Sequence, residues 1–249
     1  MREIRILKPQ KGPQEMFLST SADICIYGGA AGGGKTFGLL LDPLRHKNVK
    51  RYSAVFFRKN NIQIHAEGGL LDESISMYSG ISGAKLKYSP RPRWYFRNGG
   101  KIGFAHIERD DDLSKWQGSQ ITAIMFDELT HFTEKQFFYM LSRNRSVCGV
   151  KPYVRATCNP DADSWVAKFI EWWIDPDTGY PIPERSGKIR WMLRREDSIY
   201  WADDKKELWE QFNLKTAEEK AEPKSVTFIA STIYDNKVLL EKNPQYLAN

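Results

Sequence analysis

Residues 23–36 read Asp-Ile-Cys-Ile-Tyr-Gly-Gly-Ala-Ala-Gly-Gly-Gly-Lys-Thr, and this stretch decides the fold. Its first part, Asp23 to Tyr27, is a short apolar run that ends in glycines, as is typical of a buried β-strand. Its second part, Gly29 to Thr36, fits the pattern G-x-x-x-x-G-K-[ST] at every fixed position. The residues from Thr36 to Leu41 then read as the start of a helix. A strand, a glycine-rich loop and a helix in this order predict a phosphate-binding loop.

The residue types in this loop suit a nucleoside triphosphate. Glycines let the backbone approach phosphate closely and aim N–H groups at it, and the next helix presents its positive end. Lys35 can reach the β- and γ-phosphates, and the Thr36 hydroxyl can bind Mg²⁺. The sequence therefore predicts ATP and Mg²⁺ as cofactors. The predicted binding residues in the loop are Gly29, Ala30, Ala31, Gly32, Gly33, Gly34, Lys35 and Thr36.

Two acidic residues, Asp127 and Glu128, follow the apolar run 121–126. We expect Asp127 to hold Mg²⁺ and Glu128 to orient or deprotonate the attacking water. An exposed acidic turn after a strand is a common alternative, but the phosphate loop favours the catalytic interpretation. Because a P-loop kinase does not need activated water, the adjacent glutamate also disfavours that class of enzyme.

Polar side chains lie at two further positions that a nucleotide would need. Thr157 ends the expected strand 153–157 and Asn159 follows it, and polar groups at the carboxyl end of a neighbouring strand would face the γ-phosphate. The alternative there is an Asn-Pro turn that ends the strand. Gln14 precedes the first strand, and its amide can pair with adenine. An exposed glutamine on an entry helix is the alternative for that residue.

The rest of the chain alternates between strand-like and helix-like segments. Arg93 to Arg97 and Lys101 to Ala105 flank Asn98-Gly99-Gly100, which indicates a hairpin. The predicted fold class is therefore α/β, with a mainly parallel sheet, flanking helices and hairpin insertions. The other expected strands are 53–57 and 226–230, and the expected helices are 68–79, 134–143, 164–174 and 198–220.

Composition excludes several classes of protein. The chain has 249 residues and 41% hydrophobic residues, enough for one large domain with a full core. Its three cysteines have no C-x-x-C spacing, which argues against a disulfide framework and a zinc site. The polar N-terminus does not resemble a signal peptide, and no apolar run is long enough for a membrane span. The net charge of +6 fits an anionic partner such as nucleic acid.

These motifs stand in an order that resembles the large subunits of tailed-phage terminases across essentially the whole chain. The resemblance also rests on residues 116–121, 231–236 and 243–247. It implies a RecA-like (ASCE) ATPase domain that pumps double-stranded DNA into a procapsid. It further implies Gln14 as the adenine contact, and Thr157 to Asn159 as the motif that couples hydrolysis to movement.

The resemblance also implies partners and boundaries. The partners are double-stranded DNA, a portal protein under a homo-oligomeric ring (a pentamer), and a small terminase subunit, in the host cytoplasm and transiently at the portal. Residues 1–234 would form the ATPase domain, with a lid-like segment at about 165–222. Residues 235–249 would begin a linker toward a nuclease domain, so no nuclease activity is expected of this chain.

The chain departs from the family pattern in its arginines. Many members carry an arginine inside the phosphate loop, but here those positions are Ala30, Ala31, Gly32 and Gly33, and Gln117 stands where some members have another arginine. The positive charge at the transition state must come from elsewhere. Arg58 is our first candidate, and Arg109, Arg143 and Arg145 remain open.

Two basic stretches are candidates for contact with DNA phosphates, and for each a solvated face is the alternative. The first contains Lys85, Lys87, Arg91, Arg93, Arg97 and Lys101, and the second contains Arg185, Lys188, Arg190, Arg194 and Arg195.

Two other functions remain as alternatives. A helicase or recombinase ATPase would need a second RecA-like lobe, and superfamily-two helicases would not read Asp127-Glu128-Leu129-Thr130 after the strand. A nucleotide-dependent assembly switch with little turnover would not need Glu128.

Overall fold

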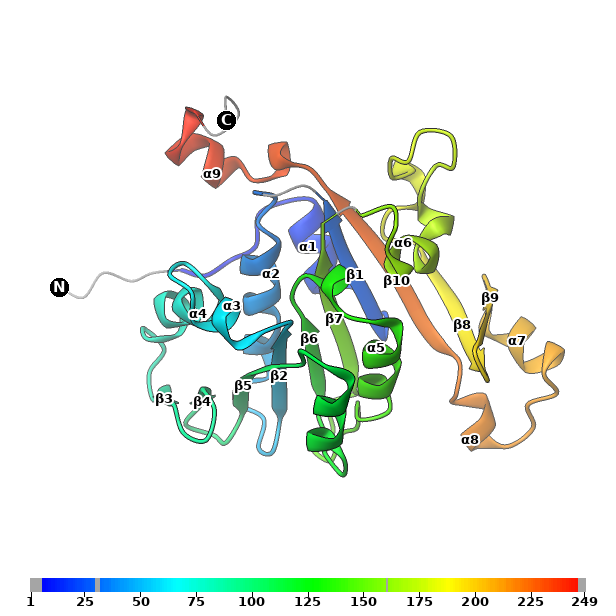
Figure 1. Ribbon diagram of the computed structural model, residues 1–249, viewed down its shortest axis with the longest axis horizontal. Helices are drawn as coiled ribbons and strands as arrows, with labels where there is room; N and C mark the ends of the chain where they lie inside the picture. The colour runs from blue at the N-terminus through cyan, green and yellow to red at the C-terminus, as the bar shows by residue number, and fades with distance from the viewer. Residues whose placement is uncertain (1–5, 30–31, 160, 246–249) are drawn as a thin grey trace.

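The computed structural model describes residues 6–29, 32–159 and 161–245, which form an α/β fold around one twisted sheet (Figure 1). Within these ranges the strands make a 10-stranded sheet in the order β3-β4-β5-β2-β6-β7-β1-β10-β8-β9. The bounds of the strands are β1 Ile24–Gly29, β2 Ser53–Arg58, β3 Lys85–Lys87, β4 Arg93–Tyr95, β5 Lys101–His106, β6 Ala123–Phe126, β7 Tyr153–Cys158, β8 Ile189–Arg195, β9 Ser198–Ala202 and β10 Lys224–Ser231. The predicted α/β class is confirmed.

The centre of the sheet is parallel and its edges are antiparallel. Strands β5, β2, β6, β7, β1 and β10 pair in parallel with one another. The β3–β4 hairpin extends the sheet at β5, and the β8–β9 hairpin extends it at β10, all by antiparallel pairing. Parallel strands are buried on both faces, which explains their almost continuous apolar sequences. The sheet is therefore mainly parallel, with a hairpin at each edge.

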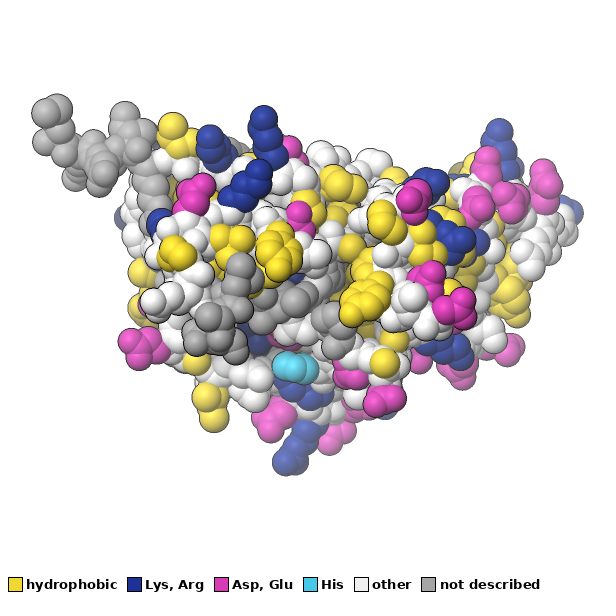
Figure 2. Space-filling model, turned by 90° about the horizontal axis from the view of Figure 1, so that it is seen from above, with side chains coloured by type: hydrophobic (Ala, Val, Ile, Leu, Met, Phe, Trp, Pro, Cys, Tyr) yellow, Lys and Arg dark blue, Asp and Glu magenta, His cyan; other side chains and the backbone are white. Residues whose placement is uncertain are grey.

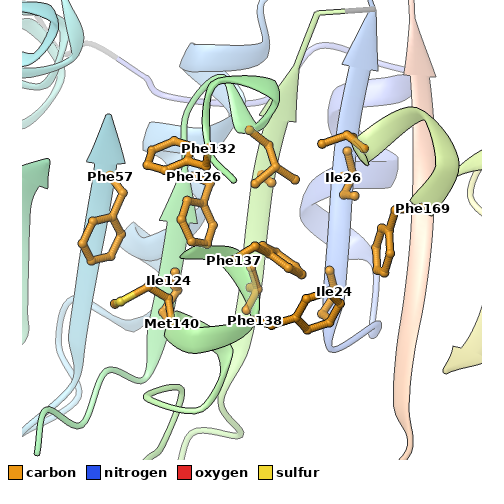
Figure 3. Packing of buried hydrophobic residues seen from close by; sticks show 14 of the residues in the cluster. Ile24, Ile26, Phe57, Ile124, Phe126, Phe132, Phe137, Phe138, Met140 and Phe169 are labelled. Atoms are coloured by element: carbon orange, nitrogen blue, oxygen red, sulfur yellow. The ribbon is translucent and has the colours of Figure 1, made fainter. Parts of the chain in front are cut away.

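Helices cover both faces of the sheet. Alternate residues of β1 point to opposite faces, so Ile24 and Ile26 join one hydrophobic cluster while Cys25 and Tyr27 join the other. Helices α5 (Glu134–Leu141) and α6 (Trp165–Phe169) pack on the first cluster (Figure 3). Helices α1 (Pro13–Ser19), α2 (Lys35–Leu41), α3 (Asn61–His65) and α4 (Leu70–Tyr78) pack on the second. In the part of the chain that the structure describes, no helix has the length and apolarity to span a membrane.

The segment 198–220 corrects one prediction. We expected a helix, but Ser198–Ala202 forms strand β9, and only α7 (Lys205–Gln211) and α8 (Ala217–Lys220) are helical. The strand is stabilised by its pairing with β8, a strand that the sequence did not predict, and by Trp201, whose ring lies 5.3 Å from that of Phe169. After α7, Asn213 has a positive φ of 51°, which breaks the helix.

Helix α6 is also shorter than predicted. The expected helix 164–174 ends at Phe169, and a 3-10 turn at Glu171–Trp173 follows it. Trp173 is 1% exposed and packs against Trp201 of the edge hairpin. The aromatic residues of this segment therefore attach the β8–β9 hairpin to the main core.

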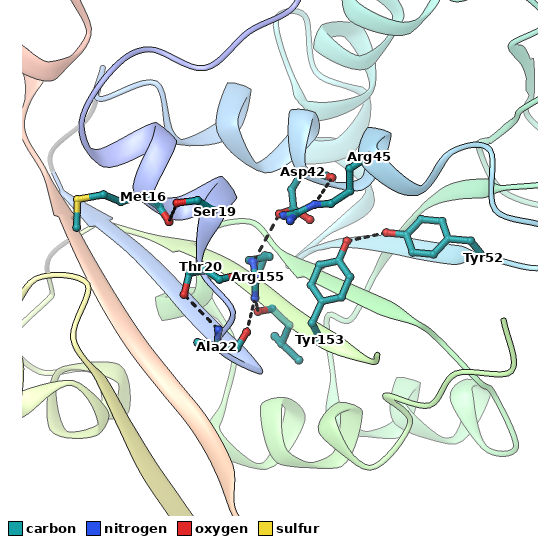
Figure 4. A network of polar contacts seen from close by, with 10 residues as sticks. Met16, Ser19, Thr20, Ala22, Asp42, Arg45, Tyr52, Tyr153 and Arg155 are labelled. Atoms are coloured by element: carbon teal, nitrogen blue, oxygen red, sulfur yellow. Dashed lines mark hydrogen bonds and ion pairs between the residues drawn. The ribbon is translucent and has the colours of Figure 1, made fainter. Parts of the chain in front are cut away.

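A buried ionic network ties the end of α2 to β7 (Figure 4). Asp42 directly follows α2 and forms an ion pair with Arg45, and its Oδ2 lies 3.6 Å from Nε of Arg155 on β7. Arg155 is 3% exposed and donates hydrogen bonds to the carbonyl oxygens of Thr20 (3.2 Å) and Ala22 (3.0 Å). This one guanidinium joins the helix after the glycine-rich loop, the strand β7 and the segment that enters β1.

We predict that Arg155→Met lowers the free energy of unfolding by about 3 kcal/mol, because it leaves a buried carboxylate with one cation fewer. Urea denaturation followed by tryptophan fluorescence measures the change. The control is Arg195→Met, which breaks a half-exposed ion pair with Glu222 and should lower stability by less than about 1 kcal/mol. Equal effects of the two variants would contradict a stabilising role for the buried network.

Candidate active site

The glycine-rich loop lies at the carboxyl edge of the sheet, between β1 and α2. A cavity of about 370 Å³ opens there, lined by residues 32–36 together with Arg58, Glu128, Asn159 and Asn236. Figure 2 looks onto this end of the molecule, where acidic and basic side chains lie interspersed. Ala30 and Ala31, which we predicted as part of the loop, lie outside the described residues. The structure therefore brings the loop together with basic, acidic and polar side chains from four other segments at one cavity.

The backbone requires glycine at both ends of this loop. Gly29 has φ +147°, and a Cβ atom there would lie 2.0 Å from the carbonyl oxygen of Ser231 on β10. Gly34 has φ +72°, and its Cβ would lie 2.5 Å from Nε2 of Gln14. A larger residue would force either neighbour away, so the tight packing of the loop explains two of the fixed glycines of the motif.

Lys35 is 6% exposed and points across the loop. Its Nζ donates hydrogen bonds to the carbonyl oxygen of Gly29 (2.8 Å) and to Oδ1 of Asn159 (3.0 Å). Burial lowers the pKa of Lys35, and the negative charges of Glu128 and Asp127 act in the opposite direction. An anion bound at the loop would favour the charged ammonium in the same way.

Thr157 joins the two acidic residues to β7. Its hydroxyl donates a hydrogen bond to Oδ1 of Asp127 (2.7 Å) and accepts one from the backbone N–H of Glu128 (3.0 Å). Glu128 has φ +60°, a left-handed conformation that costs about 1–2 kcal/mol for a residue with a side chain. The Thr157 contact therefore helps to hold Glu128 in a strained turn that directs it toward the cavity.

One carboxylate oxygen of Glu128 has no hydrogen-bond partner among the described residues. This oxygen, Oε2, is buried. Glu128 lines the cavity together with Lys35 and Asn159. A buried carboxylate oxygen without a donor is chemically suited to accept a hydrogen bond from a water molecule or a ligand.

Arg58, the last residue of β2, also reaches the cavity. Its Nη2 lies 2.5 Å from Oδ2 of Asp127, which is 1% exposed. Of the four arginines that the sequence left open, Arg109, Arg143 and Arg145 do not line the cavity. Arg143 and Arg145 follow α5 and lie beside Ile121, at the opposite edge of the sheet.

Thr36 and Asp127 fit the Mg²⁺ that the sequence predicts. Among the described residues, no group of three or more His, Cys, Asp or Glu side chains is placed to hold a metal ion. Mg²⁺ typically takes one or two protein ligands and completes its shell with water and substrate phosphates. Thr36 lines the cavity, and the carboxylate of the buried Asp127 lies next to it, held by the Thr157 hydroxyl at Oδ1 and by the Arg58 guanidinium at Oδ2. This donor set suits a Mg²⁺ ion that arrives with a nucleotide.

Gln14 lies behind the loop. It is 3% exposed, donates from Nε2 to the carbonyl oxygen of Gly34 (2.9 Å), and accepts at Oε1 from the backbone N–H of Gln10 (2.9 Å). Its amide is therefore engaged by the chain itself, and the contact with adenine stays a prediction. A second, largely apolar cavity of about 730 Å³ opens beside Gly28 and Gly29.

Sequence reasoning missed Asn236 as a site residue. Its Nδ2 donates a 2.5 Å hydrogen bond to the carbonyl oxygen of Gly32, and its side chain lines the cavity. Residues 231–236 entered the sequence analysis only as part of the family resemblance, with no role assigned to Asn236. Nothing in the spacing of residues indicates that position 236 returns to a loop that lies 204 residues earlier.

Comparison with known proteins agrees with this geometry. Residues 26–245 match the family described as "Terminase large subunit, T4likevirus-type, N-terminal". No curated protein matches the chain.

Solved structures share the fold. The large terminase from a thermophilic bacteriophage is 14% identical, with a TM-score of 0.56 over 96% of this chain and 51% of that protein. The complex of that terminase with ADP gives 16% identity and a TM-score of 0.53 over 95% of this chain and 49% of that protein. The large terminase of the HK97 bacteriophage gives 12% identity and a TM-score of 0.51 over 64% of this chain and 35% of that protein. The chain thus spans about half the length of the thermophilic phage protein, and the predicted RecA-like fold is confirmed.

Proposed function

The chain belongs to the family of terminase large subunits of T4likevirus type, and on this basis we propose that it hydrolyses ATP to move double-stranded DNA into a procapsid. One observation carries the proposal: the phosphate loop, Glu128 and Asn159 line a single cavity, and Asp127 lies buried behind it, bonded to Thr157 of β7. A nucleotide-binding protein without turnover would not need Glu128 in that strained position.

Each residue has a distinct role in the proposed reaction. The N–H groups of residues 32–36 and the ammonium of Lys35 bind the phosphates of ATP. The carboxylate of Glu128 accepts a proton or a hydrogen bond from the attacking water. Thr36 and Asp127 would hold a Mg²⁺ ion, which would neutralise phosphate charge. Asn159, already bonded to Lys35, is positioned to respond to the γ-phosphate, and Thr157 links that response to Asp127.

Arg58 supplies the arginine charge at the transition state, because the loop itself contains no arginine. It approaches the cavity from within the same chain, and its planar guanidinium suits the charge that develops on a transferring phosphoryl group. Arg58 is also the counter-ion of Asp127. Arg58 therefore neutralises the buried Asp127 carboxylate when no nucleotide is bound, and it also lines the cavity where the reaction would occur.

The larger assembly follows from the family. A pentameric ring on a portal protein, a small terminase subunit as partner, and a location in the host cytoplasm and at the portal belong to this proposal. So do residues 1–234 as the ATPase domain, the lid-like segment at about 165–222, and residues 235–249 as the start of a linker toward a nuclease domain.

DNA fits the first basic stretch better than the second. Within the described part of the chain, Lys85, Lys87 and Lys101 on β3 and β5 are exposed and form no ion pair with an acidic residue. In the second stretch Arg194 pairs with Asp197 and Arg195 with Glu222. Uncompensated charge attracts a phosphate backbone more strongly, so we propose the β3–β5 surface as the DNA contact.

For the proposed reaction, we predict that Glu128→Gln reduces steady-state ATP hydrolysis by a factor on the order of 10²–10⁴, because the base is lost and the shape is kept. Nucleotide affinity should stay within about threefold, since the loop is untouched. Phosphate release is measured over a range of protein concentrations, with and without linear double-stranded DNA. Wild-type turnover that rises with concentration and with DNA supports the packaging motor. A wild type that binds ATP but never hydrolyses it contradicts the proposed activity.

For the arginine, we predict that Arg58→Ala lowers hydrolysis by a factor on the order of 10³, while fluorescent ADP still binds. Arg58→Lys should recover only part of the rate, because an ammonium lacks the planar fork. Arg109→Ala is the matched control and should hydrolyse ATP like the wild type, because Arg109 is exposed and does not line the cavity. Full activity in Arg58→Ala would assign the charge to another residue.

For the DNA contact, we predict that changing Lys85, Lys87 and Lys101 together to Gln weakens binding to DNA of any sequence. The slope of log affinity against log salt should become shallower by about 2.7, which is 0.9 for each DNA phosphate that a lysine no longer neutralises. Fluorescence anisotropy with a labelled duplex measures both quantities. The control changes Arg194 and Arg195 of β8, which form ion pairs with Asp197 and Glu222, together to Gln and should alter the slope by less than about 1. A larger effect of the control would move the contact to β8.

A further inference from the structure

The phosphate loop is fixed by amide side chains from two distant segments. Nδ2 of Asn236 donates to the carbonyl oxygen of Gly32 (2.5 Å), and Nε2 of Gln14 donates to that of Gly34 (2.9 Å). In a planar trans peptide the carbonyl oxygen and the following N–H point in opposite directions. These two bonds therefore fix the orientation of two peptide planes whose N–H groups belong to Gly33 and Lys35.

The amides also bind each other. Nε2 of Gln10 donates to Oδ1 of Asn236 (2.8 Å), and the backbone N–H of Gln10 donates to Oε1 of Gln14 (2.9 Å). The result is one continuous network that starts at Gln10 and reaches Gly32 through Asn236 and Gly34 through Gln14. A change in the position of any member alters the hydrogen bonds that hold the loop.

Asn236 stands at the start of helix α9 (Lys237–Lys242), beyond the last strand of the parallel sheet. The turn before it is held by Asp235, whose Oδ2 accepts from the backbone N–H (2.7 Å) and hydroxyl (2.9 Å) of Thr232. Oδ1 of Asn236 also accepts from the N–H of Leu239 (3.2 Å), and Oε1 of Gln10 accepts from that of Val238 (3.2 Å). The side chain that holds the loop therefore also caps α9.

We propose that Asn236 is a positioning residue that couples the phosphate loop to helix α9, so that nucleotide binding and the placement of residues 236–242 depend on each other. This inference rests on the proposed nucleotide site. It goes beyond that site because it names the segment that responds to the nucleotide. Coupling of this kind is reciprocal: a bond to Gly32 that favours nucleotide binding must itself be favoured by the nucleotide.

Two variants separate the coupling from a purely structural cap. Asn236→Ser keeps a good N-cap residue for α9 and stays neutral, but its short hydroxyl replaces the amide that reaches Gly32. Asn236→Asp keeps the size and the acceptor for Leu239, and its charge suits the N-terminus of a helix, but it has no N–H to donate. The matched control is Asn243→Asp at the other end of α9. Asn243 is exposed, and its side chain makes no hydrogen bond with the described residues.

The experiment combines titration with fluorescent ADP and hydrogen exchange of residues 237–242, with and without saturating ADP. In the wild type and in Asn243→Asp, ADP should slow exchange in this segment. Both Asn236 variants should bind ADP roughly tenfold more weakly, because each loses the hydrogen bond to Gly32 that orients the phosphate loop. At saturation their residues 237–242 should show no response to ADP, while α2 is still protected.

Other outcomes overturn the inference. If both Asn236 variants bind ADP within twofold of the wild type, Asn236 does not position the loop. If they bind weakly but residues 237–242 still respond to ADP, the loop is not coupled to α9 through this residue. A wild type that binds no ADP at all would instead refute the proposed nucleotide site, and the coupling with it.

Discussion

The parallel register of β1, β7 and β6 is the constraint on which the rest of this structure depends. Gly28 pairs with Cys158, and Phe126 pairs with Ala156, so these three strands end at nearly the same level. The residues directly after these paired positions are Gly29, Asn159, Asp127 and Thr157, and all four belong to the candidate site. The sheet thereby brings the loop, Asp127 with Glu128, and Thr157 with Asn159 together at one edge, as parallel sheets generally do at their carboxyl ends.

Charge balance within the cavity explains why these groups are stable so close together. Lys35 and Arg58 face Asp127 and Glu128, so two cations and two anions occupy one partly buried volume. Burial alone disfavours each charge, and the mutual attraction offsets that cost. Hydrogen bonds from Thr157 and to Asn159 fix the geometry of the set.

The periphery of the sheet differs in chemistry from its centre. The exposed lysines of the β3–β5 edge form no ion pair with the described acidic residues, whereas the arginines of β8 pair with Asp203, Asp197 and Glu222. Arg190, for example, contacts Asp203 and the ring of Trp172. The first edge therefore carries positive charge that no acidic residue in the described part of the chain balances. The second edge is a small subdomain with its own core of Leu193, Ala202, Leu208 and Leu214.

The sequence by itself determined the centre of the fold and the chemistry of the cavity. Local patterns were enough there, because a fully buried parallel strand is a continuous apolar run and a phosphate loop needs glycine, lysine and threonine at fixed spacing. Only the tertiary structure decided what depends on distant contacts. Ser198–Ala202 is a strand because it pairs with β8 and Trp201 packs on Trp173, whereas the polar, helix-like residues of this segment begin only at Asp203. Arg58 alone among the candidate arginines lines the cavity because β2 ends beside β6, and Asn236 reaches Gly32 because β10 lies next to β1. These contacts join residues far apart in the chain, and hydrogen bonds and ion pairs of that kind leave no periodic signal in the sequence.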